Sequence, residues 1–205
     1  TNPLVDAERI GILGICGWGG FAINAAANDP RIKATAASTM YNMTRVSAYG
    51  YNDKMTADQR YQMRIELNSQ RTEDYRNGAY KRSVMNPKPT ANSPQFLKDY
   101  YDYYKTKRGY HERSINSGQG WNLTSSLSFI NSQILLYARE IRNAVLIVHG
   151  ENAHSRYMGE DAFKLLKGDN KQLVIVPGAS HCDLYDNVKV IPFDTIVQFY
   201  NTYLK

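Results

Sequence analysis

The sequence lacks long apolar stretches, a cysteine framework and a metal-binding pattern. No hydrophobic run among its 205 residues approaches the roughly 18 that a membrane span needs, so we expect no membrane partner. Two cysteines are too few for a disulfide framework. The four histidines and two cysteines show no paired ligand spacing, so we expect no metal and no cofactor. No signal peptide opens the chain, and together with reduced cysteines this favours a cytoplasmic protein.

Charge of one sign is only mildly in excess. The formal net charge is +6, from 25 Lys and Arg against 19 Asp and Glu, and acidic residues interrupt most of the basic ones. This scatter indicates a solvated surface, so we expect no nucleic-acid partner. Hydrophobic residues make up 42% of the chain and charged residues 21%, which is ordinary globular composition. Tyrosine is abundant, with 16 copies, and suits half-buried surfaces and pocket walls.

Both ends of the chain alternate between strand-like and helix-like segments. Short apolar runs bounded by glycine or proline predict four strands, and amphipathic or alanine-rich segments between them predict helices. The predicted strands are Ile10–Gly14, Ile32–Ser38, Ala144–His149 and Gln172–Val176, and the predicted helices are Phe21–Ala27, Glu160–Lys167 and Phe193–Leu204. This order predicts an α/β fold with a mostly parallel sheet of about four strands flanked by helices.

The middle of the chain has a different character. Residues 41–143 contain most of the tyrosines and basic residues and no convincing strand. Helices are predicted over 56–68, 93–107 and 127–142. A connection this long between the second and third strands predicts an inserted helical cap, since ordinary connections take a few residues. The expected domains are therefore a core formed by 1–40 and 144–205 and a Tyr-rich cap over 41–143.

The sharpest local motif is the segment Gly14–Gly20, which lies between a predicted strand and a predicted helix. A nucleophile at such a corner is held on a strained turn with its side chain exposed, and here that residue is Cys16. The helix N-terminus would favour the thiolate, and the backbone N–H of Gly17 would face a developing oxyanion. Two other interpretations stay open: a small buried residue in a glycine-rich turn, or a phosphate-binding turn, although neither a Gly-x-Gly-x-x-Gly pattern nor a P-loop lysine is present.

A histidine near the end of the chain gives the motif a partner. His181 follows the last predicted strand and precedes the last helix. In α/β folds that carry a nucleophile between an earlier strand and helix, the general base is a histidine at this place in the chain. His149 lies within a strand and is expected to be packed. His154 follows that strand and could line the site. Cys182 is expected to be buried or incidental.

Three segments together resemble the α/β-hydrolase superfamily, and within it the dienelactone-hydrolase-like esterases. They are Glu8–Gly20, Val148–Ser155 and Pro177–Tyr185. The resemblance implies that Cys16 is the nucleophile and His181 the general base. It implies acyl transfer to water through an acyl-enzyme, on a small-molecule ester, lactone or thioester.

The sequence departs from the family pattern at two site positions. Trp18 stands where the family has a glycine two residues past the nucleophile, so a bulky ring is expected near the substrate. The triad acid is expected at Ala153, which has no carboxylate; Glu151, Glu160 and Asp161 are nearby, and Glu151 is favoured. A Cys–His pair depends less on a third member than a serine does, because a thiol ionises readily.

A third departure concerns the front half of the family fold, which has no counterpart before Ile10. The strand Ile10–Leu13 would then be an exposed apolar edge. We expect an N-terminal segment or a second copy of the chain, as in a homo-oligomer, to cover it. The alternative function is a catalytically inactive hydrolase-fold binding or assembly protein, or an inactive fragment.

Overall fold

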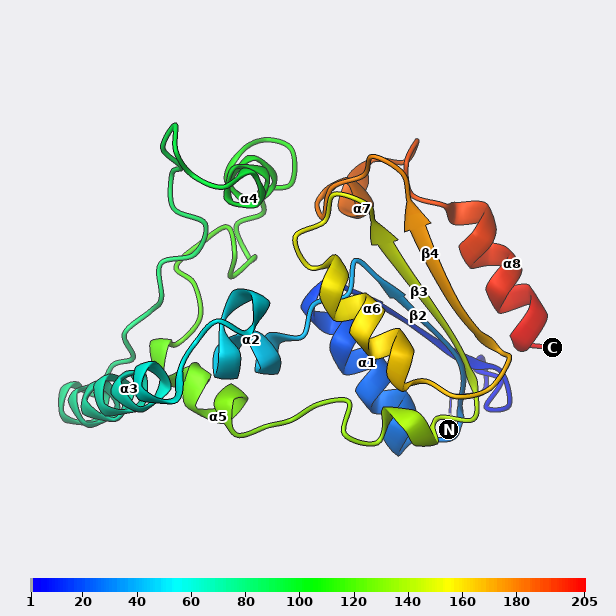
Figure 1. Ribbon diagram of the computed structural model, residues 1–205, viewed down its shortest axis with the longest axis horizontal. Helices are drawn as coiled ribbons and strands as arrows, with labels where there is room; N and C mark the ends of the chain where they lie inside the picture. The colour runs from blue at the N-terminus through cyan, green and yellow to red at the C-terminus, as the bar shows by residue number, and fades with distance from the viewer. Residues whose placement is uncertain (1) are drawn as a thin grey trace. The chain divides into compact units, whose positions relative to one another are not determined.

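The computed structural model describes residues 2–205, which form two compact units. The first unit extends to Asn42 and resumes from Ile134 to Lys205, and the second comprises Met43–Gln133. All four strands belong to the first unit, whereas the second is helical (Figure 1).

One parallel sheet organises the first unit. Its strands are β1 (Ile10–Ile15), β2 (Ile32–Ser38), β3 (Ala144–Gly150) and β4 (Lys171–Val176), in the order β1-β2-β3-β4. Each neighbouring pair is parallel. This confirms the predicted fold class, and it places all four carboxyl ends at the same edge of the sheet.

Helices cover both faces of this sheet (Figure 1). Helices α1 (Gly17–Asn28) and α6 (Arg156–Leu165) pack on one face, and α8 (Phe193–Tyr203) packs on the other. The β3 sequence is apolar at nearly every position and is buried along its whole length, because a central parallel strand has a helix layer on each side.

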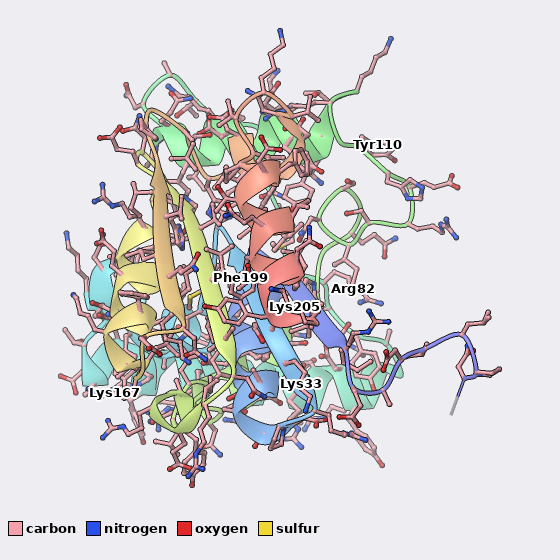
Figure 2. The ribbon with its side chains drawn as sticks, turned by 90° about the vertical axis from the view of Figure 1, so that its right-hand side faces the viewer. Lys33, Arg82, Tyr110, Lys167, Phe199 and Lys205 are labelled. Carbon is pink, nitrogen blue, oxygen red and sulfur yellow. The ribbon has the colours of Figure 1, made fainter. Side chains whose placement is uncertain are left out.

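The core beneath α8 is built from small and branched residues of the strands. Phe199, labelled on α8 in Figure 2, is 2% exposed and packs in this cluster. Its buried members are Ala34, Ala36, Ala144, Leu146, Val148, Ala179, Leu184, Ile196 and Phe199. The alanines on β2 let the ring of Phe199 approach the sheet closely.

Strand β1 lies at the edge of the sheet. Within residues 2–205 it pairs with β2 alone, and Leu13 and Ile15 are 49% and 39% exposed. The hydroxyl of Tyr200 on α8 donates a 2.6 Å hydrogen bond to the carbonyl of Ile12, which ties the edge strand to that helix. Burial raises the pKa of Tyr200 to about 12, so this donor keeps its proton over the neutral range.

The second unit consists of helices and irregular segments. Its elements are α2 (Met43–Tyr49), η1 (Tyr51–Asp53), α3 (Ala57–Asn77), α4 (Gln95–Lys105), η2 (Leu123–Ser125) and α5 (Ser126–Ile130). Helix α3 begins as predicted, at a capping box between Thr56 and Gln59, but it continues past the predicted end at Asn68 until left-handed Gly78 ends it. The rings of Phe96 and Tyr100 on α4 pack edge to face at 6.3 Å. No helix within the described chain has the length and hydropathy to cross a bilayer.

The predicted helix over 127–142 was wrong. Only α5 and a short 3-10 turn, η3 (Ala138–Glu140), form there. Leu135 adopts a left-handed φ of 71°, and its N–H donates to the Asn24 side chain at 3.2 Å. A left-handed branched residue interrupts helical hydrogen bonding, and the contact with α1 stabilises this break.

Candidate functional site

Cys16 occupies a strained turn between β1 and α1. Its backbone has φ 58° and ψ −127°, a conformation that costs a non-glycine residue about 1–3 kcal/mol. Three backbone hydrogen bonds hold it: the Cys16 N–H donates to Ser38 at 3.0 Å, and its carbonyl accepts from Gly19 at 2.9 Å and Tyr41 at 2.8 Å. The thiol is half-buried. This is the geometry in which a strand–turn–helix corner presents a nucleophile.

The glycines around Cys16 are required by close contacts. A Cβ on Gly14 would lie 2.3 Å from the Trp18 carbonyl oxygen, and a Cβ on Gly20 would lie 2.9 Å from the Tyr41 carbonyl oxygen. The turn therefore closes with glycine before the cysteine and after Trp18. Trp18 itself is 65% exposed, and its ring lies 5.6 Å from that of Phe21.

The first residue of α1 is Gly17. Backbone N–H groups in the first turn of a helix have no partner within the helix, and they carry the positive end of its dipole. Gly17 thus combines the position predicted for an oxyanion donor with a helix N-terminus directly after the thiol.

The loops after β3 and β4 are joined by several hydrogen bonds. The Glu151 N–H donates to Val176 at 2.9 Å, and the Glu151 carboxylate accepts from the Gly178 N–H at 2.8 Å. The Asn152 N–H donates to Ala179 at 2.9 Å. Glu151 is exposed, and its hydrogen bonds help to hold the loops after β3 and β4 together.

His181 lies in the loop after β4, two residues past Ala179, and each of its ring nitrogens lies beside a hydroxyl. Its Nδ1 is 2.7 Å from Oγ of Ser155, and its Nε2 is 2.9 Å from the Tyr185 hydroxyl. Ser155 is fully buried and His181 is 2% exposed. Nδ1 is the nitrogen that a triad acid contacts in a Ser–His–Asp site, and here its partner is an uncharged side chain.

Three histidines gather at this edge of the sheet. The ring of His154 lies 4.8 Å from that of His181, centroid to centroid. Burial, followed by the charges that His154 and His149 would carry, lowers the pKa of His181 well below 6.5. Burial likewise lowers the pKa values of His154 and His149 to about 4. All three rings are therefore neutral at pH 7.

Tyr41 connects the turn at Cys16 to the histidines. Its N–H binds the Cys16 carbonyl, and its ring stands edge-on to His181 at 6.3 Å and lies 6.1 Å from His154. The residues that follow β1, β2, β3 and β4 thus meet at one edge, as the carboxyl ends of parallel strands do. Cys16, His154 and His181 share this edge.

Two contacts of His181 were not foreseen from the sequence. Ser155 lies two residues past Ala153, where a carboxylate was sought, and a serine there gave no signal. Tyr185 follows His181 by four residues, a spacing that brings side chains together on a helical turn. Among residues 2–205, no group of three or more His, Cys, Asp or Glu side chains is placed to bind a metal ion.

Sequence and structure comparisons show which proteins the chain is similar to. No protein-family model matches the chain. It is 49% identical over 203 residues to PA2218 of Pseudomonas aeruginosa, an alignment that covers 98% of this chain and 54% of that protein. The crystal structure of PA2218 matches with a TM-score of 0.95 over 99% of this chain and 63% of that one.

More distant similarities were found both by sequence and by structure. YcjY of Escherichia coli is 29% identical over 189 residues, covering 91% of this chain and 60% of YcjY. The chain thus spans 54% to 60% of the length of these two relatives. The α/β hydrolase GrgF of Penicillium matches with a TM-score of 0.70 at 18% identity, over 99% of this chain and 66% of GrgF. The four-stranded parallel sheet with its flanking helices matches part of the α/β-hydrolase fold.

Proposed function

We propose that the chain carries the site of a cysteine-dependent hydrolase that cleaves a small ester, lactone or thioester through an acyl-enzyme. The observation that carries this proposal is the conformation of Cys16, φ 58° and ψ −127°, directly before the N-terminus of α1. A non-glycine residue is kept in such a conformation only when the surrounding contacts impose it, and such strain gathers at functional sites. The resemblance to dienelactone-hydrolase-like esterases supports the same chemistry.

The proposed reaction has two half-steps. The Cys16 sulfur attacks the substrate carbonyl carbon while its proton passes to Nε2 of His181, and the N–H of Gly17 donates to the oxyanion. The bond to the leaving alcohol or thiol then breaks, and His181 returns the proton to it. Water, deprotonated by His181, then attacks the carbonyl carbon of the acyl group. The carbon–sulfur bond breaks, His181 returns the proton to the sulfur, and the carboxylic acid leaves.

The other predicted residues take supporting roles in this proposal. His154, adjacent to His181, forms part of the wall that contacts the acyl group. Exposed Trp18 contributes an apolar surface at the entrance. We assign Glu151 to holding the loops after β3 and β4 together, because its carboxylate accepts the Gly178 N–H.

The test is hydrolysis of p-nitrophenyl acetate by the chain and two matched cysteine variants. Cys16→Ala removes the attacking atom, and we expect the rate above background to fall on the order of 10³-fold or more. Cys182→Ala removes a buried thiol outside the proposed chemistry and should retain most of the activity. Equal rates in the two variants would refute the proposal.

A second function, ligand binding without catalysis, is favoured by one observation. The His181 nitrogen that a carboxylate would contact is bonded to uncharged Ser155 instead. If the chain only binds a ligand, we expect the wild type to show no turnover. We also expect iodoacetamide to alkylate Cys16 slowly, at a rate that His181→Gln does not change.

A further inference from the structure

The imidazole of His181 lies between two hydroxyl groups, one on each ring nitrogen. Oγ of Ser155 lies 2.7 Å from Nδ1, and the Tyr185 hydroxyl lies 2.9 Å from Nε2. A neutral imidazole carries one proton, so one nitrogen donates and the other accepts. Either arrangement of protons satisfies the two hydroxyl contacts of the ring, and the needs of the buried Ser155 hydroxyl favour one of them.

Ser155 is the more restrictive partner. It is fully buried, and among the described residues its hydroxyl has no hydrogen-bond partner other than His181. If Nδ1 carried the proton, it would donate to Oγ, and the serine proton would be left buried without an acceptor. If Nδ1 is bare, the serine donates to it and no buried donor is stranded. A stranded buried donor shifts such an equilibrium by roughly tenfold or more.

The Tyr185 side of the ring tolerates the second arrangement. A phenol oxygen both donates and accepts, so it can take the proton of Nε2. The Asn152 and Gly178 hydrogen bonds join the loops after β3 and β4, which keeps the backbones that carry Ser155 and His181 close together. Because Ser155 is fully buried, water does not offer its hydroxyl an alternative acceptor.

We propose that Ser155 is the positioning residue of His181, and that it holds the resting imidazole with its proton on Nε2, facing Tyr185. A triad carboxylate does the opposite, since it accepts a proton from Nδ1 and leaves Nε2 bare to act as a base. The consequence for catalysis rests on the proposed hydrolase function: before His181 can accept the Cys16 proton, the ring must change tautomer and Tyr185 must release Nε2.

A carboxylate at position 155 should reverse this state. In Ser155→Asp, Nδ1 would carry the proton and donate to the carboxylate, and the negative charge would also favour the imidazolium. We expect the alkylation rate of Cys16 by iodoacetamide to rise roughly tenfold, which corresponds to about 1.4 kcal/mol. Ser155→Asn is the matched control, because asparagine is nearly the same size as aspartate but carries no charge. Its Cys16 alkylation rate should stay closer to that of the wild type.

The tautomer can be read directly from nitrogen NMR of the ¹⁵N-histidine-labelled chain, with the His181 signals assigned by their loss in His181→Gln. The nitrogen shifts of a neutral imidazole distinguish its protonated nitrogen from its bare one. We expect wild-type His181 at pH 7.5 to show a bare Nδ1 and a protonated Nε2. A proton on Nδ1 of wild-type His181 would overturn the proposal whether or not the chain hydrolyses esters. The expected pattern in a chain without turnover would leave this proposal standing and refute the hydrolase function.

Discussion

Gly14→Ala should destabilise the first unit by about 3 kcal/mol and abolish reactivity at Cys16. An added Cβ would lie 2.3 Å from the Trp18 carbonyl oxygen and 2.7 Å from Cβ of Ala22. Both obstacles belong to α1, so the helix would have to move away from β1. That movement would open the turn that strains Cys16.

Urea unfolding of Gly14→Ala and of a control variant, Gly118→Ala, measures the loss in the free energy of unfolding. Gly118 has an ordinary negative φ, and its added Cβ would approach only the Ser114 carbonyl at 3.3 Å, so this control should lose less than about 1 kcal/mol. Equal stabilities for the two variants would mean that the turn around Cys16 is not closely packed against α1.

His181→Gln should lower the rate of p-nitrophenyl acetate hydrolysis by about 10²–10⁴-fold, the range typical for removal of a general base. Glutamine keeps a polar side chain near Ser155 but does not accept a proton at neutral pH. The matched control is His111→Gln, because His111 is an exposed residue of the second unit, and its rate should match wild type. Circular dichroism of the variants shows whether each remains folded.

The pH dependence of the same reaction gives an independent measure of His181. Since burial and the neighbouring histidines lower its pKa well below 6.5, the base stays neutral as pH falls through the ordinary imidazole range. The acid limb of kcat/KM should therefore lie well below pH 6.5. A limb centred at 6.5 or above would show that His181 is not the buried neutral group described above.

The elements of the sheet could be predicted from sequence because each has a strong local signal. The apolar run of β3 and its closing glycine needed no knowledge of tertiary contacts, and the glycine-rich segment around Cys16 stood directly between a strand and a helix. The segment after Ile130 failed for the opposite reason: its apolar spacing suited a helix, but a contact between Leu135 and Asn24, over 100 residues away in sequence, stabilises a left-handed residue instead.

The partners of His181 could not be found in this way. Ser155 and His181 are 26 residues apart, and what brings them together is a set of backbone hydrogen bonds between two loops. The sequence has carboxylates near Ala153, where a triad acid was expected, and Glu151 was favoured for that role. The contact between Glu151 and the Gly178 N–H depends on the direction in which each loop leaves its strand, which residue type alone does not encode.

The account depends on a covalent bond between Cys16 and an acyl group, and intact-protein mass spectrometry after rapid mixing with p-nitrophenyl acetate measures it most directly. The account predicts a transient gain of one acetyl group, mapped to the peptide that contains Cys16, and its absence in Cys16→Ala. Acetylation confined to lysines, at equal levels in both proteins, would contradict it.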